Sequence, residues 1–84
     1  MNVTPKLKAK LKQLPAEPGV YFHKNREGEV IYVGKAAVLK NRVRQYFQSP
    51  ERKDPKTRAL VAEIDDTDWI VVDTEMDALF LESE

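Results

Sequence analysis

Two tyrosines, a lysine and an arginine stand close together in the first half of the chain. Tyr21 and Tyr32 lie in two short runs of β-branched and aromatic residues, and Lys35 follows the second run. Arg42 falls in a stretch whose apolar residues recur at helical spacing. A deprotonated phenol acts as a base, and cationic side chains counter the charge that grows on a phosphate. These residue types suit phosphodiester hydrolysis, although tyrosines are also common strand residues.

A carboxylate near the end of the chain extends this set. Glu82 lies in a run, 75–83, that is apolar nearly all round and predicts a deeply placed helix. A carboxylate late in a helix is disfavoured by burial and by the helix dipole unless a positive group neutralises it. A bound divalent cation or Arg42 would do so. A second metal ion is not expected, since the nearby carboxylates of Asp77 and Glu84 are less buried in this pattern.

A tyrosine needs help to act as a base near neutral pH. A free phenol has a pKa of about 10, so deprotonating Tyr32 at pH 7 costs roughly 4 kcal/mol. Lys35, Arg42 and a metal ion would favour the phenolate. Arg42 itself has two open interpretations, because it lies on or beside the apolar stripe of its helix and cannot easily point to water. A guanidinium there either pairs with a carboxylate or serves an anion.

The runs that carry the two tyrosines predict a β-hairpin. Residues 20–23 and 30–33 flank a polar segment that contains Gly28, which is the signal of a hairpin with a loop longer than two residues. Side chains alternate along a strand, so Tyr21 and His23 share one face of the first strand.

The rest of the pattern predicts helices and a third strand. Thr4 and Pro5 are typical of an N-cap and a first helical residue. The prolines of 49–56 favour a polar loop, and the apolar run 69–72 suits a strand that is buried on both faces. The fold class is therefore α+β, with a small antiparallel sheet of three strands flanked by helices. Strands are expected near 19–24, 29–34 and 68–73, and helices near 5–13, 37–47, 56–64 and 75–83.

Length and composition indicate one small soluble domain. The chain has 84 residues, of which 42% are hydrophobic and 33% charged, and this balance favours a folded chain. It has no cysteine and a single histidine, His23, which excludes disulfides and argues against a structural zinc site. No run has the apolar length of a membrane span, and residues 1–12 lack a signal-peptide core. A cytoplasmic location without membrane contact is the expectation.

Charge is segregated along the chain although the net charge is zero. Residues 35–58 carry a net +6, and residues 59–84 a net −9 without any basic residue. Two solvated faces of opposite sign would account for this. Alternatively, the basic middle follows phosphates and the acidic end holds a divalent cation.

Taken together, the motifs resemble a known family. Gly19-Val20-Tyr21 and Tyr32-Val33-Gly34 are similar to the two halves of the GIY-YIG nuclease motif, and the helices that carry Arg42 and Glu82 resemble those of that family. The wider pattern over residues 14–82 is similar to the N-terminal nuclease domain found in UvrC subunits of bacterial excinuclease. The chain also lacks a residue that would end its last helix. We therefore expect a single domain, 1–84, that is an N-terminal fragment of a longer protein.

The resemblance implies a function and a set of residue roles. It implies a metal-dependent endonuclease of nucleotide excision repair that incises damaged double-stranded DNA on the 3′ side of a lesion, together with UvrB. Tyr32 would activate water with help from Tyr21, and Arg42 would stabilise charge on the phosphate. Glu82 would be the one protein ligand of a single Mg²⁺ or Mn²⁺. The further implied positions are Lys35 and Tyr46 in the catalytic site and Lys35, Lys40, Arg44, Arg52 and Lys53 along the DNA.

Two alternatives remain open from the sequence. One is another GIY-YIG repair nuclease, because such enzymes share most of these motifs. The other is a DNA-binding or partner-docking module that kept the fold and lost catalysis. The joint presence of Tyr21, Tyr32, Arg42 and Glu82 favours an enzyme, since a module that only binds needs none of them as a set.

Overall fold

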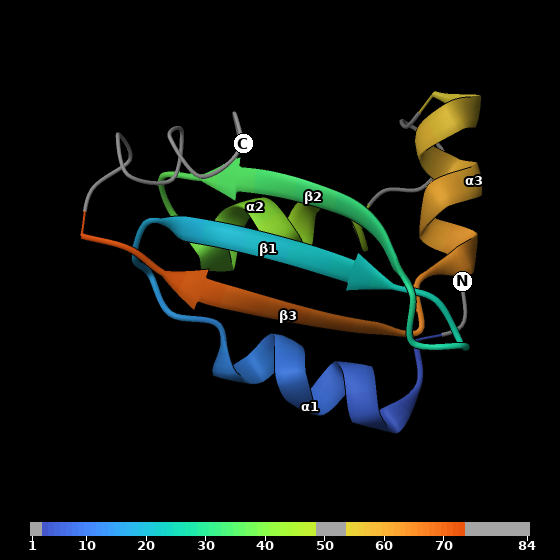
Figure 1. The fold of residues 1–84 in the computed structure, drawn as a ribbon, viewed down its shortest axis with the longest axis horizontal. Coiled ribbons are helices and arrows are strands. Elements are labelled where there is room, and N and C mark those ends of the chain that lie inside the picture. Colours follow the sequence, from blue (N-terminus) through green and yellow to red (C-terminus); the bar gives the residue numbers. More distant parts are fainter. Residues whose placement is uncertain (1–2, 49–53, 74–84) are drawn as a thin grey trace.

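The fold is an antiparallel sheet with helices, as the α+β prediction requires (Figure 1). A computed structural model describes residues 3–48 and 54–73. The helix expected near 75–83 lies outside these residues. In chain order the elements are α1 (Pro5–Gln13), β1 (Gly19–Lys24), β2 (Val30–Ala36), α2 (Leu39–Gln45), α3 (Pro55–Glu63) and β3 (Asp66–Val71).

The central strand of the sheet is β1. The strand order is β2-β1-β3, and both pairings are antiparallel. Tyr21 therefore lies opposite Gly34 on one side and Trp69 on the other. The β1–β2 hairpin is confirmed, and its turn contains Gly28 at a φ of 82°, a left-handed conformation that glycine adopts without a Cβ clash.

The helix starts follow from local capping. The Thr4 hydroxyl accepts a hydrogen bond from the backbone N–H of Leu7, and Pro5 begins α1 as predicted. Asp54 caps α3 in the same way, so Pro55 begins that helix. The prediction that placed Pro55 in a loop was wrong, because a proline at the first helical position gives up no intrahelical hydrogen bond.

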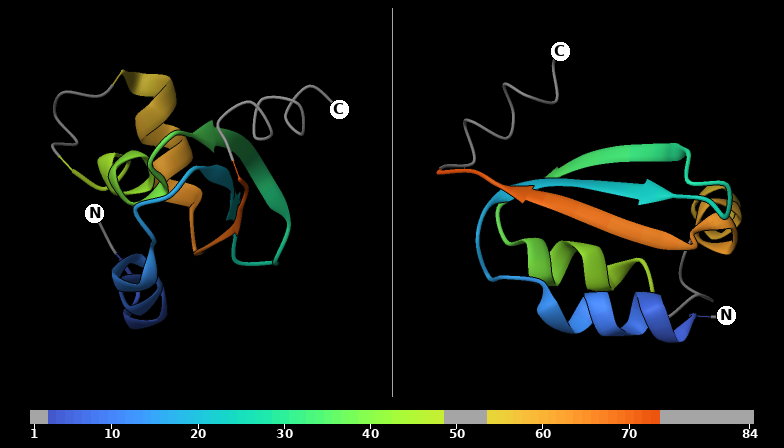
Figure 2. Two further views of the ribbon diagram at one scale, coloured as in Figure 1. Left: turned by 90° about the vertical axis from the view of Figure 1, so that its left-hand side faces the viewer. Right: turned by 60° about the horizontal axis from the view of Figure 1, so that its bottom comes forward.

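The helices leave one face of the sheet without a described helix. Helices α1 and α2 lie side by side on one side of the sheet, and α3 lies at the end near the β1–β2 turn (Figure 2). A buried cluster joins Tyr21 and Ala36 of the sheet to Leu39 and Val43 of α2. Within the described ranges, no helix is long and apolar enough to cross a membrane.

The third strand differs from its prediction. Ile70 and Val71 are exposed, with 53% and 44% of their surface accessible, so β3 is not buried on both faces. The apolar run suggested a central strand, but the pairing order makes β3 an edge strand. Burial in a three-stranded sheet is greatest for the middle strand, which here is β1, with buried Val20 and Tyr21.

Ion pairs connect α1 to β3. The Lys10 ammonium lies 3.1 Å from a carboxylate oxygen of Asp66 and also binds Asp68. Asp68 receives a second ammonium, that of Lys24, at 2.7 Å. The hydrogen bond from Lys10 and then that from Lys24 lower the pKa of the Asp68 carboxyl group. The pairs thus connect the N-terminal helix to the last described strand.

Replacing Lys10 by Met should lower the free energy of unfolding by about 1 kcal/mol, because a partly buried ion-pair network contributes more than one exposed pair. Urea denaturation at low salt measures this difference. Lys8→Met is the matched control, since Lys8 lies on the same helix and is exposed. Equal losses in the two variants would contradict a role for these ion pairs.

Candidate active site

Four aromatic side chains meet on the face of the sheet that α2 covers. This aromatic cluster consists of Tyr21, His23, Tyr32 and Tyr46, whose ring centroids lie 4.6–6.2 Å apart. Tyr21 and His23 come from β1, Tyr32 from β2, and Tyr46 from the C-cap of α2. The alternation predicted for the hairpin is thus confirmed for Tyr21 and His23. Offset and edge-to-face contacts at these distances hold the rings in fixed relative positions.

The glycine of β2 makes room for the cluster. A Cβ atom on Gly34 would overlap the ring and the hydroxyl of Tyr21, because the Tyr21 side chain crosses its strand partner. A Cβ on Gly19 would meet the carbonyl oxygen of Ile70 and the side chain of Leu39. Gly34 therefore permits the close approach of the Tyr21 side chain to β2. Gly19 permits the close approach of β1 to the Leu39 side chain of α2.

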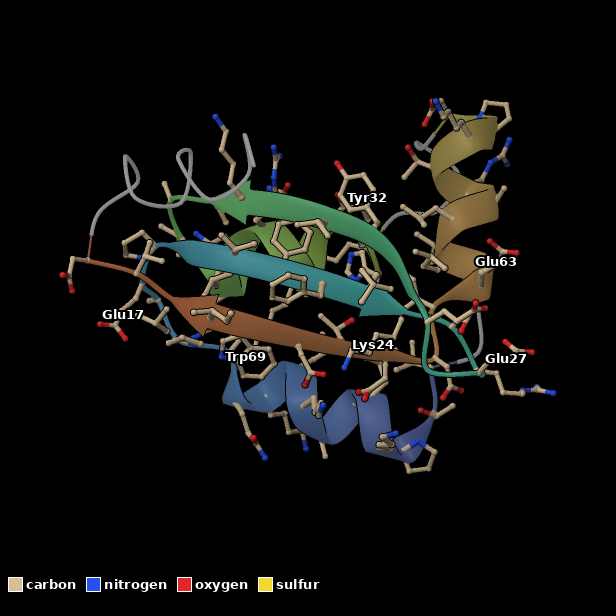
Figure 3. All side chains as sticks on the ribbon, in the orientation of Figure 1. Glu17, Lys24, Glu27, Tyr32, Glu63 and Trp69 are labelled. Atoms are coloured by element: carbon tan, nitrogen blue, oxygen red, sulfur yellow. The ribbon has the colours of Figure 1, made fainter. Side chains whose placement is uncertain are left out.

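The three phenols differ in exposure. Tyr21 has 1% of its surface accessible, whereas Tyr32 has 41% and projects from the outer edge of β2 (Figure 3). The hydroxyls of Tyr21 and Tyr46 are hydrogen-bonded at 2.9 Å. Burial raises the pKa of both Tyr21 and Tyr46, so these two phenols stay protonated at neutral pH. Tyr32 is the cluster phenol with open access to water.

His23 lies at the bottom of the cluster. It is fully buried, and its Nδ1 lies 3.0 Å from the hydroxyl oxygen of Thr67, which is also fully buried. Among the residues that the structure describes, none forms a hydrogen bond with its Nε2. Burial lowers the pKa of His23 to about 4, because a charged imidazole would lack solvation there. His23 is therefore a neutral packing residue that orients the ring of Tyr46, 4.6 Å away between centroids.

Arg42 extends from α2 towards the strands beside the cluster. It is exposed, and no salt bridge to it is found in the described part of the chain. The prediction that Arg42 cannot easily point to water was wrong, because Arg42 is exposed and borders the apolar stripe without entering it. The guanidinium lies near the Tyr21 phenol, whose pKa it acts to lower against the larger effect of burial.

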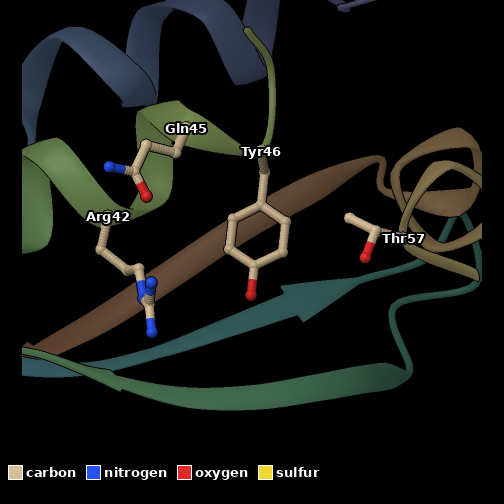
Figure 4. A pocket seen from close by; sticks show the side chains of 4 residues that line it. All are labelled: Arg42, Gln45, Tyr46 and Thr57. Atoms are coloured by element: carbon tan, nitrogen blue, oxygen red, sulfur yellow. The ribbon is translucent and has the colours of Figure 1, made fainter. Parts of the chain in front are cut away.

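Arg42 lines two of the hollows that are formed by residues 3–48 and 54–73. The first, the Thr57 hollow, has a volume of about 350 Å³ and is lined by Arg42, Gln45, Tyr46 and Thr57 (Figure 4). The second, the Lys35 hollow, has a volume of about 370 Å³ and lies between the end of β2 and α2. Arg42 and Gln45 line both hollows. The guanidinium is thus placed between two spaces that open next to the phenols.

Lys35 belongs to the second hollow and not to the aromatic cluster. It is paired with Val20, so it lies on the opposite sheet face from Tyr21. Because β2 is an edge strand, Lys35 nevertheless lines the hollow that Arg42 borders. The structure therefore brings Lys35 to Arg42 rather than to the phenols.

The remaining predicted site residues fall into two groups. Lys40 is exposed on α2, whereas Arg44 is half-buried and donates a hydrogen bond to the carbonyl oxygen of Leu11 at 3.3 Å. Through this hydrogen bond Arg44 links α2 to α1. Arg52, Lys53 and Glu82 lie outside the described residues.

The open side of the site fits a hydrated divalent cation. Mg²⁺ keeps several of its waters in proteins and needs solvent-filled space beside the reacting groups. The exposed edge of β2 at Tyr32 provides such space. No group of three histidine, cysteine or acidic side chains is gathered within residues 3–48 and 54–73.

Sequence reasoning missed Thr67 and Gln45. Thr67 is opposite His23 only through the β1–β3 pairing, which joins residues distant in the chain. No local signal predicts that register. Gln45 could have been found, because it lies three residues after Arg42 and is therefore on the same side of a helix.

Comparisons with known proteins agree with this geometry. The family model described as the UvrC-like GIY-YIG domain matches residues 17–84. The chain is 56% identical over 77 residues to UvrABC system protein C of Syntrophomonas wolfei and 59% identical over 76 residues to that of Acetivibrio thermocellus. These matches cover 92% and 90% of the chain but only 13% and 12% of those relatives.

A solved structure extends the likeness to three dimensions. The GIY-YIG N-terminal endonuclease domain of UvrC from Thermotoga maritima, bound to its catalytic magnesium, superposes with a TM-score of 0.81 at 38% identity. The superposition covers 96% of the chain and 86% of that domain.

Acid should destabilise the chain through His23. Its pKa is about 4 when folded and about 6.5 when unfolded, so the unfolded state binds more protons between these values. Stability is therefore complete above pH 6.5 and falls as the pH approaches 4. We expect a loss of about 2 kcal/mol between pH 7.5 and pH 5 in urea unfolding. The paired replacement His23→Phe with Thr67→Val should abolish this loss, whereas the same loss in both proteins would contradict the assignment.

Proposed function

The chain belongs to the family of UvrC-like GIY-YIG domains, and we propose that it is a metal-dependent DNA endonuclease domain. The observation that supports this most directly is the exposed phenol of Tyr32, which is held in the aromatic cluster beside Tyr21 and Tyr46, while Arg42 lies near the Tyr21 phenol of the same cluster. Both halves of the GIY-YIG motif contribute to the cluster. The first half supplies Tyr21, and the second half supplies Gly34, which leaves space for the Tyr21 ring.

The proposed reaction is hydrolysis of one phosphodiester bond on the 3′ side of a lesion in double-stranded DNA. The proposed setting is nucleotide excision repair, with UvrB as the partner that delivers the DNA. The names of the relatives place them in the UvrABC system, and the solved neighbour is an N-terminal endonuclease domain. Because the chain spans an eighth or so of those relatives, we propose that it is the N-terminal domain of a longer protein.

Tyr32 takes the proton from the attacking water in this proposal. Among the phenols of the cluster, that of Tyr32 is the most exposed to solvent. Burial raises the pKa of Tyr21 and Tyr46, so those two phenols stay protonated. Protonated phenols donate hydrogen bonds, so Tyr21 and Tyr46 can stabilise a neighbouring phenolate without competing for its role. General-base catalysis of this kind contributes about 10²- to 10⁴-fold in rate.

Arg42 meets the charge that develops on the phosphate. Its guanidinium is exposed between the two hollows and is not held by a described carboxylate, so it is available to an anion. Planar donors suit phosphate oxygens, and an interaction that strengthens in the transition state raises turnover more than binding. Lys35 adds a second cation in the Lys35 hollow, which Arg42 also lines.

Glu82 is the proposed single protein ligand of one Mg²⁺ or Mn²⁺. A magnesium ion is present in the Thermotoga maritima domain and is called catalytic there. When bound, such an ion lowers the pKa of its water or shields the leaving oxygen. Exposed Lys40, together with Arg52 and Lys53, would follow the DNA backbone by releasing counterions.

The test of this function is Glu82→Gln. The amide keeps the shape of the side chain and removes its charge, so the variant should fold and bind DNA but lose Mn²⁺ affinity. It should also nick damaged duplex DNA at least 10²-fold more slowly when placed in the full-length protein with UvrB and Mg²⁺.

Two measurements test the Glu82→Gln variant. Mn²⁺ titration of the chain reports the metal, and the nicking assay reports turnover. An unchanged Mn²⁺ affinity, or nicking at the wild-type rate, would contradict the metal assignment. Wild-type protein that binds damaged DNA with UvrB but never nicks it would favour a module that lost catalysis.

A further inference from the structure

The Lys35 hollow contains two polar side chains, those of Asn41 and Gln45, that the proposed reaction does not use. Its volume of about 370 Å³ lies between the end of β2 and the exposed side of α2. Its polar lining residues are Lys35, Asn41, Arg42 and Gln45, and its remaining lining is apolar. Asn41 and Gln45 have no place in the water activation or charge stabilisation described above.

The two amides are positioned together by the helix. Asn41 and Gln45 are four residues apart on α2, a spacing that puts side chains on the same side of a helix. Arg42 follows Asn41 and precedes Gln45 by three residues, so the guanidinium is flanked by both amides. All three side chains are exposed and free to meet a ligand from solvent.

The composition of this hollow fits an anion with several acceptor oxygens. Two cations supply positive charge, and each amide supplies N–H donors. No carboxylate lines the hollow among the residues that the structure describes.

The Thr57 hollow is less suitable for an anion. The carboxylate of Asp54 accepts a hydrogen bond from the backbone N–H of Thr57 at 3.2 Å. A negative group therefore lies next to that hollow and would repel a phosphate.

We propose that the Lys35 hollow binds the phosphate adjacent to the scissile phosphate on the cleaved DNA strand. This rests on the proposed function and deepens it. Asn41 and Gln45 donate hydrogen bonds to the oxygens of this flanking phosphate, and Lys35 balances its charge. Arg42 borders the hollow and faces the scissile phosphate.

The flanking phosphate would set the position of the strand. Contacts to phosphates fix the register of a nucleic acid on a protein without reading its sequence. One phosphate held in the hollow places the next phosphodiester beside Arg42 and the exposed Tyr32. Alignment of this kind accelerates a reaction by holding the reacting atoms in place.

Single neutral phosphates test the proposal. Duplexes in which one phosphate near the cleavage site is replaced by an uncharged methylphosphonate are bound to the chain in EDTA, so that no cleavage occurs. We expect wild type to lose about tenfold in affinity when the flanking phosphate is neutral. Gln45→Glu and Asn41→Asp place a carboxylate in the hollow and should bind unmodified DNA about tenfold more weakly. Each variant should then be insensitive to neutralisation at that one position.

Gln13→Glu is the matched control. Gln13 is an exposed glutamine at the end of α1 that lines neither hollow, and its replacement changes net charge equally. This variant should keep the sensitivity of wild type. If Gln45→Glu and Gln13→Glu behave alike at every position, the flanking-phosphate site is refuted. Mg²⁺-dependent nicking by the wild-type full-length protein with UvrB is measured in parallel. If the wild type nicks DNA, only the flanking-phosphate site is refuted; if it does not, the proposed function fails as well.

Discussion

The hydrogen bond between the phenols of Tyr21 and Tyr46 joins the sheet to α2 and holds the site together. At 2.9 Å it connects the middle strand to the end of the helix that carries Arg42. It forms because Gly34 leaves space for the Tyr21 ring to cross its neighbouring strand. His23 supports the Tyr46 ring from below. This pair of phenols thus fixes the distance between the strand that exposes the Tyr32 phenol and the helix that carries the Arg42 guanidinium.

The same packing divides the phenols by role. Burial disfavours the charged form of a phenol, so Tyr21 and Tyr46 are kept as hydrogen-bonding groups. Tyr32 touches both rings from an edge strand and retains contact with water. A cluster of three similar side chains therefore provides one exposed phenol and two protonated partners. The difference arises from position in the sheet rather than from residue type.

Local pattern predicted most elements, and long-range pairing decided the rest. The alternation of the hairpin placed Tyr21 and His23 on one face, and the capping signals of α1 were confirmed. The His23–Thr67 contact depends on the register of strands 44 residues apart, which no short window contains. The exposure of Ile70 depends on the strand order, because the same apolar run would be buried in a central strand. Periodicity placed Arg42 near the apolar stripe of its helix but could not decide whether the side chain lies at the border of the stripe or inside it.

The most direct test of the account is the pH dependence of single-turnover nicking at saturating Mg²⁺, for wild type and for Tyr32→Phe in the full-length protein with UvrB. If Tyr32 is the base, the wild-type rate should rise with pH, because only the deprotonated form of a general base accepts the proton of the attacking water. Tyr32→Phe should be at least 10²-fold slower and should lose that rise. A variant that keeps the wild-type rate and slope would show that another group takes the proton.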